Sequence, residues 1–553
     1  MGGPGIETER KFEGGAAGPR LDTRALPGVG QVVPAADEEL DAVYYDTHDL
    51  RLLAHGTTLR RRRGGHDAGW HLKRPLDGDR REETAWPDTG DDVLPEALAV
   101  RVIAVARGAA VIPVLRLRTR REREHLLDRK GARLAEVAHD HVAAELLRRP
   151  GYITAWSELE VEVEVEPPKN GKNSKNSKNS KNGKNGKNGK SSKSGKAAEN
   201  NEAAEAAALL DAVETQLSDA GWHRSDAPSK AARAFADTGA APASATPSRA
   251  ARPGSIGHAV HARIATQRDA LLAADPGVRL DDPEGVHDMR VAARRLRSLL
   301  RSYRRCFDRR VTDPIADELR DLGRSLGEAR DHQVLAARVL STATELCEAD
   351  ESTCFELADA ASRIDAAEST AYQQKRLSAV EDLNRKRYFR LLDRLELLVS
   401  SPPFRPGRAD RKAPRELRKV VRKEQRRLAR RAARIDSATD PGDRDTALHA
   451  TRKAAKRARY AAEVAIPISG HTGANAARFA KRTKAVQRLL GEHQDSVVAR
   501  DMLRTRAADA HAEGADTFAY GLLYAAEQRA AERAEEKLPK VRAKAEQRRL
   551  ARI

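Results

Sequence analysis

The 553-residue sequence is poor in aromatic side chains, which make up only 4% of it. Proteins that bind single-stranded nucleic acid stack bases on aromatic rings, so this content argues against nucleic acid as a partner, although binding of the backbone would not need rings. The sequence also lacks an apolar run of membrane-spanning length and the basic-then-apolar start of a secretion signal. We therefore expect a cytoplasmic protein with no membrane partner.

Cysteine is scarce as well. Cys306, Cys347 and Cys354 share no metal-ligand spacing with histidine, and an odd count does not suit a disulfide framework. We expect three reduced side chains, buried or half-buried, in a reducing cytosol. The glycine-rich phosphate loops of Walker or kinase type are absent too, so side chains must hold any nucleotide or polyphosphate that the protein binds.

Basic residues exceed acidic ones, 101 to 82, and the net charge of +19 predicts anionic partners. The chain is long enough for several domains. Residues up to about 166 show strand patterns, and residues from about 256 onward are helical. We predict a first domain at 1–236 with a disordered Lys/Asn/Ser/Gly insertion at 169–196, a flexible linker at 237–255 and a second domain at 256–545.

The first strand pattern is "IETERKF", which alternates charged residues with spacers. On an extended strand Glu7, Glu9 and Lys11 project to one side. Two carboxylates so close repel each other, and a divalent cation with oxygen ligands is the natural partner for them. An exposed edge strand of mixed charge is the alternative interpretation of this strand taken alone.

Further strands carry the same period-two pattern, and each carries mainly one sign of charge. The aligned sets are Arg60 with Arg62, His71 with Lys73, Arg116 with Arg118 and Arg120, and Glu158 with Glu160, Glu162 and Glu164. The spacers of the acidic set, Leu159, Val161 and Val163, require a core. Segregated charge favours a closed barrel with a polar lumen over a solvated sheet, with a polyanion on one wall and metal ions on the other. Phosphoryl transfer needs both.

Seven segments in order resemble the CYTH family of triphosphate tunnel enzymes: "IETERKF", "YYDTHDLRL", "TLRRRRGG", "GWHLKRP", "LRLRTRR", "WSELEVEVE" and "SKAARAF". The resemblance implies an eight-stranded antiparallel β-tunnel with flanking helices. It would bind a linear triphosphate through basic residues and divalent metal, Mg²⁺ or Mn²⁺, through acidic ones. The family includes inorganic triphosphatases, thiamine triphosphatases and class IV adenylate cyclases.

The resemblance also implies roles for individual residues. Glu7, Glu9, Glu160 and Glu162 would bind metal, and Asp140, which shares a face with Glu136, could join them. The phosphate path would be lined by Lys11, Arg60, Arg62, Lys73, Arg118 and Arg120. Glu7, Glu9 and Lys11 would be catalytic. The sequence leaves open whether Arg80 with Glu82 or Arg81 with Glu83 faces inward, and whether Lys230 approaches the tunnel or lies on a helix surface.

The helical half contains an internal repeat. "VHDMRVAARRLRSLLRSY" recurs as "LHATRKAAKRARYAAE", so that His287, Arg290, Arg294 and Arg297 match His449, Arg452, Lys456 and Arg459. Offsets of three, seven and ten residues place each set on one helical stripe. A second pair, "LGEARDHQV" and "LGEHQDSVV", puts Gly327 40 residues after His287 and Gly491 42 residues after His449. These spacings indicate a duplicated helical bundle.

The basic stripes lack the acidic residues that solvated helices place three or four positions away. We therefore predict that they bind a polyanion, with plain solvation as the alternative. The repeats resemble the CHAD family, which implies two pseudo-symmetric four-helix bundles around a basic channel for inorganic polyphosphate. His332 in "ARDHQV" departs from the acidic residue expected there.

Together these patterns predict a metal-dependent triphosphatase, acting on inorganic triphosphate or a similar triphosphate, joined to a polyphosphate-binding module. A non-catalytic polyphosphate-binding protein that localises to polyphosphate granules is the first alternative. Adenylate cyclase activity is a further alternative within the enzyme class. A nucleic-acid binder fits the charge but lacks a recognisable reading motif.

Overall fold

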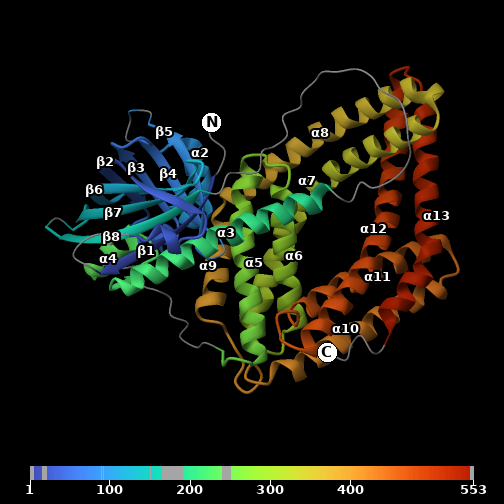
Figure 1. Cartoon of the computed structure of the whole chain (residues 1–553). Coiled ribbons are helices and arrows are strands. Elements are labelled where there is room, and N and C mark those ends of the chain that lie inside the picture. Colours follow the sequence, from blue (N-terminus) through green and yellow to red (C-terminus); the bar gives the residue numbers. More distant parts are fainter. Residues whose placement is uncertain are drawn as a thin grey trace. The chain divides into compact units, whose positions relative to one another are not determined.

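The computed structural model describes residues 5–14, 21–76, 78–88, 90, 93–149, 151–164, 191–239 and 251–547, with the backbone alone for 191–203. The chain forms two compact units, Met1–Ser244 and Ala245–Ile553 (Figure 1). Residues 169–190 of the predicted insertion and 240–250 of the predicted linker lie outside the described residues. The two units are described one at a time.

The first unit is an antiparallel barrel. Its strands are β1 (Gly5–Gly14), β2 (Val29–Asp46), β3 (Thr58–Arg63), β4 (Gly69–Pro75), β5 (Arg80–Pro87), β6 (Ile112–Asp128), β7 (Arg133–Leu146), β8 (Ile153–Glu164) and β9 (Trp222–Arg224). They run in the order β5-β4-β3-β2-β6-β7-β8-β1-β9, and pairing of β5 with β1 closes the first eight into a tunnel. The predicted eight-stranded fold is confirmed.

Helices cover the apolar outer faces of the barrel. They are η1 (Thr23–Ala25), α1 (Arg51–Ala54), α2 (Glu96–Ala106) and α3 (Ser191–Asp219). A further helix, α4 (Lys230–Asp237), lies at one end of the lumen. Leu159 and Val161 of β8 are buried with Leu209 and Val213 of α3. Each such side chain contributes about 1.5–3 kcal/mol on burial. This packing forces Glu158, Glu160 and Glu162 of β8 into the lumen.

The lumen is not charged throughout, because α4 fills one end of it with apolar side chains. Phe235 and Ala231 of α4 pack with Leu115 and Leu117 of β6 and with Val142 of β7. These strand residues share the inward face with the charged residues further along. The charged part of the tunnel therefore ends on an apolar floor.

The second unit is helical and duplicated. Its helices are α5 (Ile256–Arg279), α6 (Gly285–Ser302), α7 (Arg309–Ala349), η2 (Glu351–Thr353), α8 (Cys354–Asn384), α9 (Lys386–Ser400), α10 (Ala413–Asp436), α11 (Pro441–Glu463), α12 (His471–Ala512) and α13 (Phe518–Glu546). The helices α5 to α8 correspond to α10 to α13, and α9 connects the two sets. The long members match closely, with 41 residues in α7 and 42 in α12. Two four-helix sets confirm the predicted fold.

Backbone hydrogen bonds join the two repeats where each begins. Ser255 and Lys412, which cap α5 and α10, form an antiparallel bridge. The amide of Ile256 donates to the carbonyl of Arg411 at 2.8 Å, and the amide of Ala413 donates to the carbonyl of Gly254 at 3.0 Å. The reciprocal pattern is that of a pseudo-two-fold axis.

The cysteines differ from the sequence-based expectation. Cys347 and Cys354 form a disulfide across the turn between α7 and α8, while Cys306 is free and buried. The odd count suggested no framework, but a seven-residue separation across a helical hairpin brings two of the three within bonding range. In the described part of the chain no helix has the length and apolar character to cross a membrane.

Candidate functional site

The tunnel contains a carboxylate-rich wall made by β1 and β8 together with β5. The two strands β1 and β8 are antiparallel neighbours, with Glu9 opposite Glu162 and Lys11 opposite Glu160. Lys73 lies on β4, the strand next to β5, and its Nζ lies 2.7 Å from Glu7 Oε1, 3.9 Å from Glu9 and 3.8 Å from Glu83. One ammonium group therefore serves three carboxylates.

This wall holds more negative charge than its cations balance. Burial, together with the charges of Glu9, Glu83 and Glu162, raises the pKa of Glu7 to about 8 despite Lys73. Burial likewise raises the pKa of Glu162, with Glu160 and Glu9 adding to the effect. A cation bound among clustered carboxylates would stabilise their charged form and lower their pKa values. The oxygen-only donor set of Glu7, Glu9 and Glu162 suits Mg²⁺ or Mn²⁺.

A second group of carboxylates is already neutralised. Glu160 contacts Lys11, and its Oε2 lies 2.7 Å from Lys230 Nζ and 2.8 Å from Arg121 Nη2. Burial alone would raise the pKa of Glu160, but these three cations hold it well below its usual range. Asp140 is fully buried, 2.9 Å from Lys230, and accepts two bonds of 2.8 Å from Arg121. Asp140 therefore supports the tunnel floor more than it offers a free metal ligand.

The opposite wall is rich in arginine. Arg60 and Arg62 of β3 and Arg121 of β6 are buried or half-buried in the lumen. Burial, Arg60 and Arg121 lower the pKa of Arg62 to about 9. Within the described structure the buried Nε atoms of Arg60 and Arg62 have no hydrogen-bond partner. Arg62 is paired with Asp67, and Arg60 donates to the hydroxyl of Tyr44 at 3.3 Å. Crowded guanidinium groups that keep an unpaired Nε donor are suited to binding phosphate.

The two walls face one cavity of about 110 Å³. Its lining residues are Glu38, Arg60, Arg62, His66, Asp67, Lys73, Glu83, Arg121, Arg133, Glu136, Glu160 and Glu162. The predicted tunnel residues Glu7, Glu9, Lys11, Arg60, Arg62, Lys73, Glu160 and Glu162 are thus brought together in the lumen.

The predicted positions of Arg118 and Arg120 are wrong. Both are exposed on the outer face of β6, where Arg120 donates to Glu122 at 3.2 Å. The lumen-facing residues of β6 have odd numbers, from Leu115 through Thr119 to Arg121. Arg121 takes the place that we expected for Arg118 and Arg120.

The structure also resolves two questions left open by the sequence. In β5 the inward pair is Arg81, whose Nε lies 2.9 Å from Glu9, and Glu83, which lies 2.8 Å from His71 Nδ1. Lys230 is buried at the start of α4 and approaches the tunnel. The sequence alone could not choose Glu83 over Glu82, because the neighbouring register, Arg80 with Glu82, has the same pattern.

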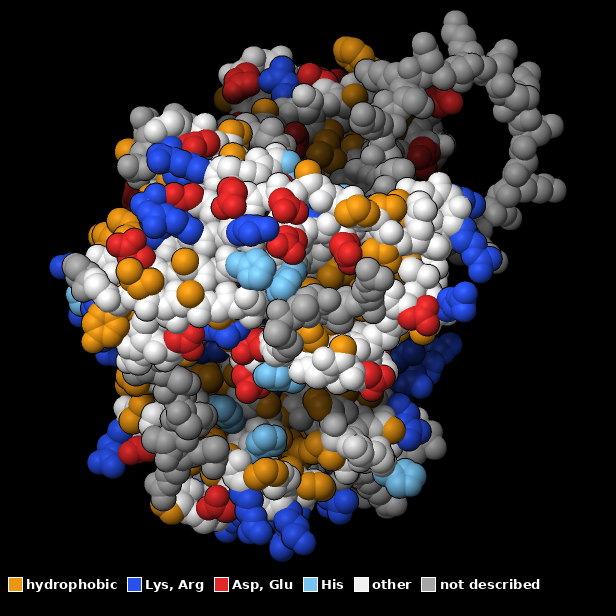
Figure 2. Space-filling view, turned by 60° about the vertical axis from the view of Figure 1, so that its left-hand side comes forward, with side chains coloured by type: hydrophobic (Ala, Val, Ile, Leu, Met, Phe, Trp, Pro, Cys, Tyr) orange, Lys and Arg blue, Asp and Glu red, His pale blue; other side chains and the backbone are white. Residues whose placement is uncertain are grey.

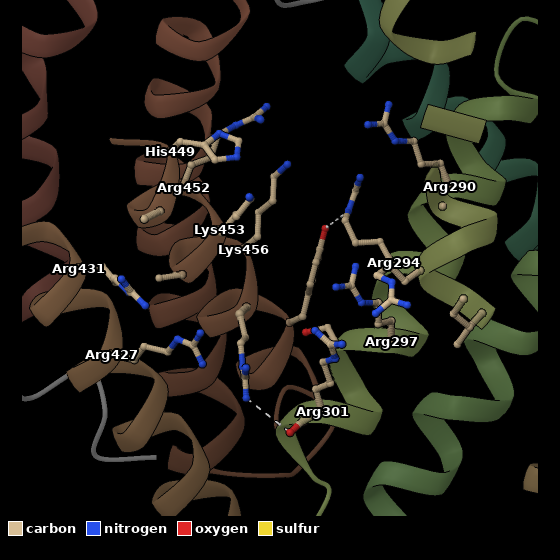
Figure 3. Close-up of a pocket in the computed structure, with 18 of the residues that line it drawn as sticks. Arg290, Arg294, Arg297, Arg301, Arg427, Arg431, His449, Arg452, Lys453 and Lys456 are labelled. Carbon is tan, nitrogen blue, oxygen red and sulfur yellow. Dashed lines mark hydrogen bonds between the residues drawn. The ribbon is translucent and has the colours of Figure 1, made fainter. Parts of the chain in front are cut away.

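The helical unit contains a larger cavity of about 690 Å³ between its repeats. Basic side chains of α6 and α11 reach toward one another across it (Figure 3). Its charged and histidine lining is Arg290, Arg294, Arg297, Arg301, Arg320, Arg324, Arg427, Arg431, His449, Arg452, Lys453, Lys456 and Arg457. No acidic residue is among the described residues that line it. On the surface face in Figure 2, by contrast, acidic and basic side chains are intermingled.

Equivalent contacts recur in the two repeats. Arg290 lies 2.8 Å from Asp331, and Arg452 lies 3.5 Å from the equivalent Asp495. A Cβ at Gly327 would lie 3.4 Å from Arg290 Nη2, and a Cβ at Gly491 would lie 3.4 Å from Arg452 Nη2. Gly327 of α7 and Gly491 of α12 have no side chain, and they therefore leave room for the guanidinium groups of Arg290 and Arg452.

Unbalanced positive charge is the main electrostatic feature of this cavity. Burial, followed by Arg452, Arg294 and Arg290, lowers the pKa of Lys456 to about 7. Two of these arginines belong to the other repeat, so the stripes of α6 and α11 form one site. Such crowding is relieved when an anion enters.

Six of the eight predicted stripe residues line the cavity: Arg290, Arg294, Arg297, His449, Arg452 and Lys456. His287 and Arg459 do not line it. Arg459 donates to Glu463 at 2.9 Å and to Gln487 at 2.9 Å. The stripes did not predict the lining residues from other helices, namely Arg320 and Arg324 of α7 and Arg427 and Arg431 of α10, each pair spaced four apart.

A closed barrel with a charged lumen, followed by a duplicated helical unit with a basic cavity, defines a triphosphate tunnel protein with a basic helical module. Residues 5–192 match the family described as CYTH domain, and residues 262–504 match that described as CHAD domain. The chain belongs to the proteins in which a CYTH domain is followed by a CHAD domain.

The chain is also similar to two curated proteins and to solved structures. Uncharacterised proteins from Mycobacterium tuberculosis, strains CDC 1551 / Oshkosh and ATCC 25618 / H37Rv, are 34% identical over 536 residues, covering 96% of this chain and 95% of theirs. The CHAD domain from the plant Ricinus communis is 26% identical, covers 53% of this chain and 93% of its own, and has a TM-score of 0.42. PptA from Streptomyces chartreusis is 19% identical, with coverages of 52% and 99% and a TM-score of 0.42.

Proposed function

We propose that the tunnel is a divalent-metal-dependent triphosphatase that hydrolyses inorganic triphosphate or a related linear triphosphate. The observation that carries this proposal is the pairing of two unbalanced walls in one lumen. The pKa values of Glu7 and Glu162 are raised on one wall, and the pKa of Arg62 is lowered on the other. A triphosphate with its bound metal would relieve both.

The tunnel residues would divide the work of hydrolysis. Arg60, Arg62 and Arg121 hold phosphate oxygens through their fixed donors and neutralise charge that develops on the terminal phosphoryl group. Mg²⁺ or Mn²⁺ held by Glu7, Glu9 and Glu162 would supply polarisation of a phosphoryl oxygen. A tunnel carboxylate orients the water that attacks the terminal phosphorus. The phosphorus–oxygen bond to the leaving group breaks, and phosphate and pyrophosphate leave.

We propose further that the cavity of the helical unit binds inorganic polyphosphate. Its basic lining, free of acid among the described residues, suits a chain of repeated phosphates rather than a single compact anion. Lining residues from α6, α7, α10 and α11 allow contacts along an extended ligand. Such a module would raise the local concentration of polyphosphate without taking part in bond cleavage.

The experiment that tests the tunnel proposal compares two arginine variants. We expect Arg62→Ala to lower kcat/KM for phosphate release from inorganic triphosphate by about 10². Arg118→Ala removes the same side chain from the outer face and should leave kcat/KM unchanged. Equal loss in both variants, or in neither, would contradict the assignment of the arginine wall as the phosphate site.

A further inference from the structure

The outer face of the barrel carries a second cluster of ligating side chains, on β6 and β7. His139 and His141 are two apart on β7 and therefore project to the same side. Glu122 of β6 is the register partner of His139. One ligand atom from each of the three residues lies within 4.8 Å of the other two. Asp140, between the histidines, points the other way into the tunnel.

Each of the two histidines has a ring nitrogen that can serve as a ligand atom. His139 Nε2 is buried and has no hydrogen-bond partner in the described structure. A hydrogen bond of 2.9 Å joins His141 Nδ1 to Ser157 Oγ. The other ring nitrogen, Nε2, faces Glu122 and lies 3.8 Å from its Oε1. Metal-binding histidines are oriented in this way by a partner on the second nitrogen.

The surroundings hold the imidazole rings in place and leave one side open. The ring centroids of His139 and His141 lie 4.6 Å apart, and the buried Trp222 meets His139 edge-on at 5.8 Å. The side chains of His141 and Glu122 are each 44% exposed. Arg120 donates to Glu122 Oε1 at 3.2 Å, the same oxygen that lies 3.8 Å from His141 Nε2, so a bound metal ion would compete with Arg120 for this carboxylate.

We propose that Glu122, His139 and His141 bind one divalent metal ion such as Zn²⁺ on the outer face of the barrel. Two imidazoles and one carboxylate form the ligand set of three-residue zinc sites, which keep a further position for water or another ligand. Imidazole ligands select against Mg²⁺. This ion would be distinct from the metal of the tunnel, whose donors are carboxylate oxygens alone.

The test is a count of bound Zn²⁺ in the chelator-treated full chain without an affinity tag. Binding is measured by equilibrium dialysis in excess Mg²⁺, which occupies the oxygen-only sites. We expect His141→Ala and Glu122→Gln, both at exposed positions, to bind one equivalent less than the wild type. His223→Ala, an exposed histidine on β9 of the same unit, is the matched control and should keep that equivalent. Co²⁺ in place of Zn²⁺ should give visible absorption that the two site variants lack.

Three results would overturn the proposal. The first is an unchanged Zn²⁺ count in His141→Ala and Glu122→Gln. The second is an equal loss in His223→Ala, which would indicate unspecific histidine binding. The third is loss in His287→Ala alone, because Glu284, His287 and Asp288 form another group of three ligands in the helical unit. Triphosphate hydrolysis is not needed for any of these readouts, so the result is independent of the proposed function.

Discussion

The tunnel and the helical cavity both concentrate charge, but they do so in opposite ways. The tunnel sets carboxylates against lysines and arginines, so groups of both signs line one lumen. The cavity of the helical unit is lined by one sign. A site that must hold a cation and an anion together needs both signs, whereas a site that only grips a polyanion needs one. This difference supports the proposal of a hydrolytic site in the tunnel and a binding site in the cavity.

Loss of one tunnel carboxylate should have the largest effect. Glu7→Gln removes a donor from the metal wall, and we expect metal-dependent phosphate release from triphosphate to fall at least about a hundredfold. Phosphate release is measured beside polyphosphate binding, which should not change. Hydrolysis at the wild-type rate in a folded Glu7→Gln protein would contradict the assignment of the tunnel as the metal-dependent hydrolytic site.

Loss of one cavity arginine should have the next largest effect. Arg294→Gln removes a guanidinium group that points into the shared site, and polyphosphate should bind about tenfold more weakly. Arg459→Gln is the matched control, because Arg459 is already bonded to Glu463 and Gln487. Titration of polyphosphate at two salt concentrations measures both variants. Equal weakening in Arg459→Gln would show that general charge, and not the cavity, binds the polymer.

The cavity should also respond to pH near neutrality. Since the pKa of Lys456 is about 7 in the free protein, this group is charged below pH 7 and loses its proton above it. A bound polyanion favours the charged form, so affinity for polyphosphate should fall as pH rises from 6 to 8, by a factor of up to about 10. Lys456→Arg should flatten this dependence. A slope equally steep in Lys456→Arg would exclude Lys456 as its source.

The smallest effect concerns the stability of the tunnel without metal. The pKa of Glu7 is about 8 in the folded protein and 4.5 as the ordinary value, so the folded state binds the extra proton. The contribution of Glu7 to stability is therefore full below pH 4.5 and is lost as pH rises through 8. In chelator, the melting temperature of the wild type should fall over this range relative to that of Glu7→Gln. Mn²⁺ should reduce the difference, and parallel curves without metal would contradict it.

The sequence predicted the barrel because the apolar spacers of β8 needed a core, which placed its glutamates inside. It did not predict the face of β6, where arginines occupy both sides of the strand at 116, 118, 120, 121 and 123. The deciding feature is the apolar floor. Leu115 and Leu117 pack against Phe235, which fixes the odd-numbered face, and with it Arg121, in the lumen. A contact with a helix more than 100 residues away is not visible in the strand pattern.

The helical stripes were predictable within each helix but not between helices. The spacing of His449, Arg452 and Lys456 correctly gave one face of α11, because these positions follow the helical repeat. Arg459 does not line the cavity because its side chain forms an ion pair with Glu463, one helical turn further on. Arg427 and Arg431 joined the cavity through the packing of α10, which the pattern of a single helix cannot specify.

The most direct test of the central claim is phosphate release from inorganic triphosphate by the purified wild-type chain, with Mg²⁺, with Mn²⁺ and with chelator. Our account predicts release of phosphate and pyrophosphate with at least one of the metals and none with chelator. Absence of release with either metal, from a folded protein that still binds polyphosphate, would contradict it. The tunnel would then be a second binding site, and its paired walls would need another explanation.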